Sequence, residues 1–165
     1  MTTPLSAPTP LNDARDLSGF DSGVATLDDW LRRRARSNQA GGASRTYVVA
    51  RGDVVVGYYA LASGAVAMTD APGPLRRDMP DPIPVTLLGR MAIDRAEQGR
   101  GLGTALLQDA VLRSLQVARI VGVRGLLVHA ISDVARRFYL GHGFVPSPVN
   151  PMTLILSLKA RAEGT

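Results

Sequence analysis

The 165-residue chain is long enough for one domain with a hydrophobic core and too short for two ordinary domains. Its composition, 45% hydrophobic and 20% charged, is typical of a folded soluble protein; no apolar run could span a membrane, and the start lacks the pattern of a signal peptide. The lack of cysteine excludes disulfides and thiolate chemistry and fits the cytoplasm, and two histidines 13 residues apart do not suggest a metal site.

The positive charge is strongly biased toward arginine. Of the 19 cationic side chains, Lys159 alone is a lysine; the formal net charge is +5 and the isoelectric point is near 10.4. The planar guanidinium of arginine suits phosphate, whereas the ammonium of lysine is a point charge. This balance indicates either a polyanionic partner or an anionic cofactor, or else an arginine-rich solvated surface.

The N-terminal third of the chain predicts a lead-in, a helix and two strands. Residues 1–18 contain Thr and Pro and are expected to be a flexible lead-in. Residues 22–38 have apolar side chains at helical spacing, which predicts one amphipathic helix. Residues 45–51 and 54–66 are rich in Val and Tyr and predict an antiparallel pair joined by a tight turn at 52–53.

The middle of the chain predicts a loop, a central strand and a long helix. Residues 70–84 are proline-rich without periodicity and predict a long surface loop, of the kind that often covers a site. Residues 85–94 are an apolar run broken by Gly89 and Arg90, which predicts a central strand with a bulge or splay at the glycine. A helix is expected over 101–121.

The last third predicts a strand over 125–131, a helix over 132–143, and then a strand, a proline-rich loop and a strand. Ser132 or Asp133 is the expected N-cap of that helix, with Gly141 or Gly143 at its end. This order predicts an α/β fold with a mixed, mostly antiparallel sheet and one βαβ crossover. Residues 19–160 are expected to form a single domain.

Glycines stand at every second position in the stretch EQGRGLGTALL. A Walker A loop would need a lysine after Gly103, where Thr104 stands. A dinucleotide-binding loop would need G-x-G-x-x-G and a later acid, and neither is present. A glycine loop that enters a helix suits an anion, with Arg100 adding charge, although it also suits a plain tight turn.

Two motifs resemble those of the GNAT superfamily of N-acetyltransferases. MAIDRAEQGRGLGTALLQDAV is similar to its acyl-CoA-binding segment, whose pattern Q/R-x-x-G-x-G/A is matched by Gln98, Gly101 and Gly103. SDVARRFYLGHGF is similar to its A-x-x-x-Y-x-x-x-G-F element, through Ala135, Tyr139, Gly143 and Phe144. From Phe20 to Leu158 the chain further resembles the GNAT toxins of bacterial toxin–antitoxin modules.

The resemblance implies the GNAT fold, in which flanking helices surround a sheet with a splayed strand pair that holds acetyl-CoA as cofactor. Backbone groups of Met91, Ala92 and Ile93 would meet the pantetheine arm. The residues implied to wrap the pyrophosphate are Gln98, Gly99, Arg100, Gly101, Leu102, Gly103 and Thr104. Ser132 stands where many members have an asparagine that contacts the cofactor arm, so this contact is lost or made through water.

The same resemblance places Tyr139 near the sulfur as the acid that protonates the departing thiolate. With an ordinary pKa of about 10 the phenol is protonated at pH 7, although the ring could instead simply pack in the core. Asp94 and Glu97 are the only nearby acids, so no general base is evident, and this favours an α-amine, which is largely neutral at pH 7. His129 lies in an apolar strand and is expected to be a core residue rather than the base.

Seven arginines are candidates for an acceptor-binding surface of phosphate contacts: Arg32, Arg33, Arg36, Arg45, Arg76, Arg77 and Arg90. In one continuous helix Arg32 and Arg36 share a face, with Arg33 beside them. Arg90 lies in an apolar strand, where an unpartnered arginine would be costly. A solvated charged face is the alternative for each. The few aromatic residues argue for recognition through phosphate and shape rather than base stacking.

The resemblance therefore implies an acetyl-CoA-dependent toxin that acetylates aminoacyl-tRNA, blocks translation, forms a homodimer and is neutralised by a ribbon-helix-helix antitoxin. A second reading is an acetyltransferase acting on a small amine, an antibiotic or a protein N-terminus. A third is a CoA-binding or RNA-binding module without activity, which the glycine loop and Tyr139 disfavour. No membrane or metal partner is expected.

Overall fold

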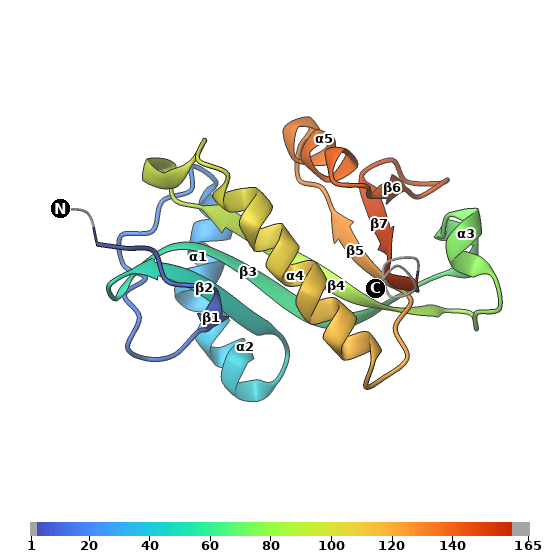
Figure 1. Cartoon of the computed structure of the whole chain (residues 1–165), viewed down its shortest axis with the longest axis horizontal. Coiled ribbons are helices and arrows are strands. Elements are labelled where there is room, and N and C mark those ends of the chain that lie inside the picture. Colours follow the sequence, from blue (N-terminus) through green and yellow to red (C-terminus); the bar gives the residue numbers. More distant parts are fainter. Residues whose placement is uncertain (1–2, 160–165) are drawn as a thin grey trace. The chain divides into compact units, whose positions relative to one another are not determined.

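The computed structural model describes residues 3–159. The chain divides into two compact units, of which unit 1 comprises Met1–Ala62 and Gly89–Ala110, and unit 2 comprises Ser63–Leu88 and Val111–Thr165. Figure 1 shows the helices and strands along the chain. Each unit has its own packed interior.

Unit 1 begins with a hairpin-based sheet and two short helices. Its elements are β1 (Thr9–Pro10), α1 (Ala25–Arg33), α2 (Ala35–Gly41), β2 (Arg45–Arg51), most of β3 (Val54–Val66), the end of β4 (Ile83–Ile93), η2 (Arg95–Glu97) and the first half of α4 (Leu102–Ala118). The antiparallel pair β2–β3 turns at Gly52, whose φ is 60°. The predicted strands and turn are confirmed at this hairpin.

The core of unit 1 forms where α1 packs on β3. Leu27 and Leu31 are buried together with Phe20 and Tyr58, and the Trp30 ring stacks on Tyr58 with 5.9 Å between centroids. Each fully buried side chain of this size contributes about 1.5–3 kcal/mol to stability. The core therefore fixes the face that α1 presents to the sheet.

Two expectations for the N-terminal region are wrong. The predicted single helix over 22–38 breaks at Arg34, whose φ of −121° lies outside the helical region, and no glycine or proline signals the break in sequence. Residues 3–18 also differ from the expected flexible lead-in, because β1 pairs with β2 and the side chains of Leu11 and Leu17 are buried. The burial of these apolar side chains stabilises the packing of the segment against the sheet.

Unit 2 contains the remaining strands and a helix that follows the parallel crossover. Its elements are the end of β3, η1 (Met68–Asp70), α3 (Gly73–Arg76), the start of β4, the end of α4, β5 (Gly125–His129), α5 (Asp133–Gly141), β6 (Val145–Pro146) and β7 (Thr153–Ser157). The prediction of a long surface loop over 70–84 is wrong. The segment contains α3, and its side chains Leu75 and Ile83 are buried with Leu127 and Ile155.

Within the described residues the strands hydrogen-bond in the order β1-β2-β3-β4-β5-β7-β6. The pair β4–β5 is parallel and is bridged by α4, which confirms the predicted βαβ crossover in a mostly antiparallel sheet. The parallel ladder joins Val85–Leu88 to Gly125–Val128 and ends one residue before Gly89. Gly89, where a bulge or splay was predicted, is thus the first residue of β4 beyond the parallel ladder with β5.

Candidate functional site

The glycine stretch forms a loop between η2 and α4, as predicted. Gly99 and Gly101 have φ values of 79° and 81°, which side-chain-bearing residues rarely adopt. An added Cβ at either position would meet no protein atom within 4 Å, so the backbone faces open space there. The N–H groups in the first turn of α4 have no partner within the helix, and the Arg100 side chain is 64% exposed. Such a loop can hold an anionic group.

The entry to this loop is held by a buried ion pair. The Glu97 side chain is only 8% exposed, and its carboxylate accepts hydrogen bonds from Arg51 Nε at 3.0 Å and NH2 at 2.8 Å. The hydrogen bond from Arg51 lowers the pKa of Glu97 below its ordinary value. Sequence reasoning missed Arg51, because it lies 46 residues from Glu97 and no local pattern marks the pair.

Gln98 and Asp94 tie the same loop entry to the segment before α1. The side-chain amide of Gln98 donates to the carbonyl oxygens of Ser22 and Ile93, both at 2.9 Å. The Asp94 carboxylate accepts the N–H groups of Asp21 at 3.1 Å and Ala96 at 3.0 Å. Asp94 and Glu97 are thus both engaged in hydrogen bonds that hold the loop entry in place.

Met91, Ala92 and Ile93 form the last residues of β4, next to the loop within unit 1. Ala92 is buried, while Met91 and Ile93 are partly exposed. The structure therefore brings this strand end together with residues 98–104, all of which belong to unit 1. The backbone of the strand end and the backbone of the loop are the two parts that a long phosphate-bearing cofactor needs.

Tyr139 and Ser132 belong to α5 in unit 2. The Tyr139 side chain is 6% exposed, and its ring packs against Phe138 and Phe144 with centroid separations of 5.3 and 5.4 Å. Burial raises the pKa of Tyr139 to about 12, so its phenol stays protonated over a wide pH range. Ser132 is the N-cap of α5, as predicted, and its hydroxyl oxygen accepts the Ala135 N–H at 3.1 Å.

Unit 2 also contains a cavity of ≈ 260 Å³. Apolar side chains of Val66, Leu87 and Leu127 line it together with the polar side chains of Asp70 and His129. The expectation of a core histidine is wrong in one respect, because His129 is exposed at the end of β5, although its Nδ1 is hydrogen-bonded to Thr153 Oγ1 at 2.9 Å. Both faces of β5 are buried, since Leu126, Leu127 and Val128 are all buried, and His129 is exposed because it is the last residue of the strand.

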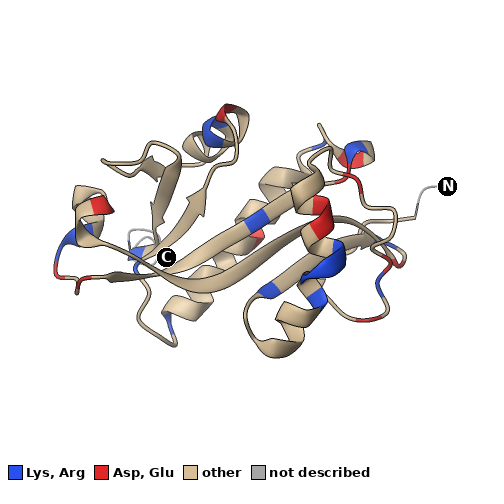
Figure 2. Cartoon of the chain, turned by 180° about the vertical axis from the view of Figure 1, so that it is seen from behind, with Lys and Arg blue, Asp and Glu red and all other residues tan. Residues whose placement is uncertain are grey.

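The predicted arginines differ in how much of their charge is free. Arg32 donates to the Phe20 carbonyl at 2.6 Å and pairs with Asp29 at 3.3 Å. Arg36 donates to the Arg15 carbonyl. Because the helix breaks before it, Arg36 belongs to α2 and does not share a continuous helical face with Arg32, which corrects that expectation. Figure 2 shows the acidic first half of α1 followed by its basic end.

The Arg33 side chain, by contrast, is exposed and makes no hydrogen bond or ion pair within residues 3–159. Arg45 donates to the Gln39 carbonyl at 2.7 Å. Arg90 is exposed rather than buried in its strand, and its guanidinium lies over the Trp30 ring, 4.7 Å from the centroid. Stacking on an aromatic face replaces the buried ion pair that the apolar context of Arg90 would have required.

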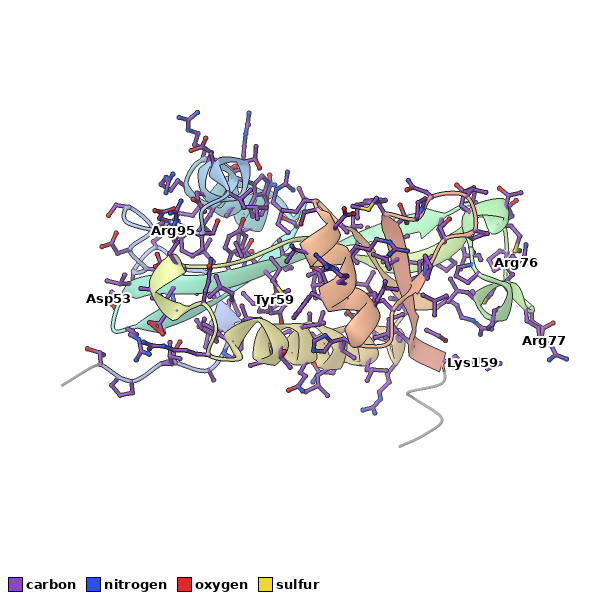
Figure 3. The ribbon with its side chains drawn as sticks, turned by 90° about the horizontal axis from the view of Figure 1, so that it is seen from above. Asp53, Tyr59, Arg76, Arg77, Arg95 and Lys159 are labelled. Atoms are coloured by element: carbon purple, nitrogen blue, oxygen red, sulfur yellow. The ribbon has the colours of Figure 1, made fainter. Side chains whose placement is uncertain are left out.

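Arg76 and Arg77 lie in unit 2, whereas the other five predicted arginines lie in unit 1. Both are exposed at the end of α3, and Figure 3 shows the two side chains there. The backbone carbonyl of Arg77 accepts a hydrogen bond from Arg124 at 3.0 Å, which anchors the chain and leaves the Arg77 side chain outside that contact.

In the part of the chain that the structure describes, no three His, Asp or Glu side chains gather in a way that could hold a metal ion. Over the same residues, no helix is both long and apolar enough to cross a membrane.

Comparison with known proteins gives concordant results. A family model described as the Acetyltransferase (GNAT) domain matches residues 42–146. The chain is 54% identical over 158 residues to a tRNA-acetylating toxin of Mycobacterium tuberculosis, and the aligned residues cover 95% of each chain.

Two solved structures resemble the chain over almost its whole length. The toxin AtaT complexed with acetyl-methionyl-tRNAfMet is 29% identical with a TM-score of 0.89, over 97% of this chain and 98% of that one. A tyrosine-to-phenylalanine mutant of AtaT, bound to the C-terminus of the antitoxin AtaR and to acetyl-CoA, is 30% identical with a TM-score of 0.80, over 94% of each chain.

Proposed function

The chain belongs to the GNAT family of acetyltransferases, and from this premise we propose that it is a toxin that acetylates the α-amino group of aminoacyl-tRNA and so blocks translation. The observation that carries the proposal is the 54% identity, over 95% of both chains, to a protein named for tRNA acetylation. The AtaT structure that contains acetyl-methionyl-tRNAfMet supports the same substrate class.

Acetyl-CoA is the acetyl donor, and it carries the acetyl group as a reactive thioester. The glycine loop fits this cofactor: two glycines with positive φ leave an open cradle before a helix N-terminus, and Arg100 adds an exposed positive charge. We assign the pyrophosphate to residues 98–104 and the pantetheine arm to the backbone of Met91, Ala92 and Ile93. The Ser132 hydroxyl keeps its proton while its oxygen caps α5, and we propose that any contact it makes with the arm runs through water.

The reaction needs a neutral amine as nucleophile and a proton for the departing thiolate. An α-amine has an ordinary pKa of about 7.7–8.0, so a large fraction is neutral at physiological pH without help from a base. Tyr139 is the proposed proton donor, because burial keeps its phenol protonated and excludes a role as a base at neutral pH. The engagement of Asp94 and Glu97 in structural bonds is consistent with this division of roles.

The acceptor tRNA is held by the seven predicted arginines, among which Arg33 and Arg90 are best suited. Arg33 is exposed and makes no bond within residues 3–159 that a phosphate would have to displace. Arg90 stacks on Trp30, so the edge of its guanidinium can still donate to a phosphate oxygen. Arg32, Arg36 and Arg45 already donate to backbone carbonyls, and a phosphate contact from them would use their remaining N–H groups.

The finer assignments of the partners also belong to this proposal. The antitoxin is of the ribbon-helix-helix type, the toxin forms a homodimer, and its action on aminoacyl-tRNA takes place in the cytoplasm. The binding of AtaT to the C-terminus of AtaR supports an antitoxin as such.

The test is acetylation of charged total tRNA by the purified protein with radiolabelled acetyl-CoA. We expect label in RNA that alkaline deacylation removes, and a kcat lowered by about a hundredfold in Tyr139→Phe, the range expected for loss of an acid catalyst. Tyr58→Phe is the matched control, since it also removes a buried phenol, one that donates to the Leu27 carbonyl, and it should retain kcat. No label in RNA, with CoA binding intact, would reject aminoacyl-tRNA as the acceptor.

A further inference from the structure

Glu97 presents an electrostatic problem to the loop that follows it. Its carboxylate is almost fully buried one residue before Gln98, so its negative charge lies at the entry to a segment that, on the proposed function, receives a pyrophosphate. A buried carboxylate is costly without a partner, and a negative charge next to an anion site weakens binding. The charge must therefore be compensated from within the protein.

Two arginines can supply that compensation. Arg51 donates two hydrogen bonds to Glu97, at 3.0 and 2.8 Å, through a bidentate arrangement. Arg100 Nη1 lies 3.7 Å from Glu97 Oε1, which is beyond hydrogen-bond distance, and the Arg100 side chain is 64% exposed. Arg51 is the strongly bound partner, and Arg100 is held only loosely.

Arg51 is itself well anchored. It is the last residue of β2, its backbone forms a bridge with Leu5, and its NH1 group donates to the Thr3 carbonyl. The Arg51 side chain is 22% exposed, so most of it is packed between these partners. Its guanidinium is therefore held in one place, whereas the Arg100 guanidinium is free to turn toward solvent or toward a ligand.

We propose that Arg51 is a positioning residue for the cofactor, which satisfies Glu97 and thereby leaves Arg100 and the loop backbone available to the pyrophosphate. This inference rests on the proposed function, because it concerns the same cofactor site. Without Arg51, Arg100 is the remaining cation within reach of the Glu97 carboxylate among the described residues. Arg100 would then turn toward Glu97 to compensate its charge, and the loop would lose a phosphate ligand.

The test compares the binding of CoA with that of pantetheine by titration calorimetry. CoA carries the pyrophosphate, and pantetheine has the arm without any phosphate. Arg51→Met should raise the Kd for CoA by about tenfold, the effect of losing one charge-assisted contact, and leave the Kd for pantetheine unchanged. The exposed Arg119→Met, which removes the same charge elsewhere, should change neither Kd.

Glu97→Gln provides the second arm of the test, and its expected effect has the opposite sign. The amide oxygen can still accept from Arg51, and the negative charge that attracts Arg100 is gone, so CoA should bind at least as tightly as to the wild type. In the double variant R51M/E97Q most of the CoA affinity lost in R51M should return, because no carboxylate remains to draw Arg100 away from the pyrophosphate. If R51M does not fold, E97Q and the conservative R51K provide the test. R51K should then bind CoA more weakly than the wild type, by less than the tenfold expected for R51M.

A merely structural Arg51 would give a different result. Its loss would then weaken CoA and pantetheine alike, E97Q would weaken CoA, and the double variant would be at least as impaired as R51M; any of these outcomes overturns the proposal. The measurement needs no acceptor, so a failure to acetylate tRNA leaves it intact. A wild-type protein that binds no CoA would overturn both this inference and the proposed function.

Discussion

Burial limits Tyr139 to one protonation state. Its ring lies in an aromatic cluster with Phe138 and Phe144, and the hydroxyl keeps its proton because its pKa is raised to about 12. The alternatives that the sequence left open, an acid catalyst or a packed core ring, are thus physically compatible with each other: the packing is what keeps the acid protonated. The catalytic role itself stays a prediction.

This pKa shift predicts a difference between wild type and Tyr139→Phe in alkaline solution. Above about pH 10 the unfolded chain releases the phenolic proton while the folded chain keeps it, so the free energy of unfolding of the wild type falls as pH rises. The phenylalanine variant lacks this loss. The difference in Tm between the two proteins, measured by thermal melts, should be constant up to about pH 9 and then move against the wild type.

The Tm difference would stay constant through this range if the phenol were solvated in the folded state. Tyr58→Phe serves as a comparison, since burial also raises the pKa of Tyr58, and it should show a shift in the same direction.

At the scale of elements, the loop before α4 shows how a local sequence pattern sets a local backbone shape. Alternating glycines and a following run of helix formers lie within a dozen residues, and the predicted loop and helix are both present. Positive φ at Gly99 and Gly101 is the reason that only glycine suits these positions. By contrast, the helix over 22–38 was predicted as one and is two, since the geometry at Arg34 has no sequence marker.

Gly101→Ala should separate backbone strain from loss of the cradle. The left-handed φ of 81° costs a residue with a side chain about 1–2 kcal/mol, and the new methyl group meets no protein atom, so folding stability should fall by no more than this amount. CoA affinity should fall by about tenfold or more, because the methyl group occupies the space assigned to the pyrophosphate. Chemical denaturation and calorimetry measure the two effects.

Gly122→Ala is the matched control for this substitution. Gly122 has open space around it and no positive φ, so both stability and CoA affinity should be retained. An unchanged CoA affinity in Gly101→Ala would argue against the assignment of the loop to the pyrophosphate.

At the scale of the whole molecule, the excess of arginine acts through screened electrostatics. A net charge of +5 attracts a polyanion, and each phosphate that an arginine neutralises releases a counterion and makes binding more salt-dependent. The expected acceptor is therefore distinguishable from a small neutral amine by salt alone. Figure 2 shows cationic and anionic segments scattered over several elements, so net charge by itself does not define a binding face.

Arg33→Ala tests one of these phosphate contacts. Its side chain is exposed and makes no bond within residues 3–159, so stability should be unchanged. The affinity for tRNA should fall, and the slope of log K against log salt should decrease in magnitude by about 1. Filter binding over a range of KCl concentrations measures the slope, with the exposed Arg119→Ala as the control of equal charge change. Equal slopes for the two variants would remove Arg33 from the tRNA surface.

Much of the fold was predictable, because most of its signals are local. The hairpin of β2 and β3, the Ser132 cap of α5 and the glycine loop are each set by residues close together in the chain. The family resemblance, carried by two motifs, correctly indicated an acetyltransferase, and the mixed sheet with a parallel β4–β5 pair followed from the order of elements.

The amino-acid sequence by itself determined the order of elements and the glycine loop, because periodicity, capping and glycine spacing act over a few residues, and the resemblance of its motifs indicated the family. Only the tertiary structure decided that Arg51 neutralises Glu97, that Arg90 lies exposed on Trp30 and that His129 lines a cavity. Arg51 and Glu97 are 46 positions apart in the chain, and Arg90 and Trp30 are 60 apart. The cavity at His129 is lined by residues from several separate segments. They depend on strand register and helix packing, which are set by the burial of the whole core rather than by neighbouring residues.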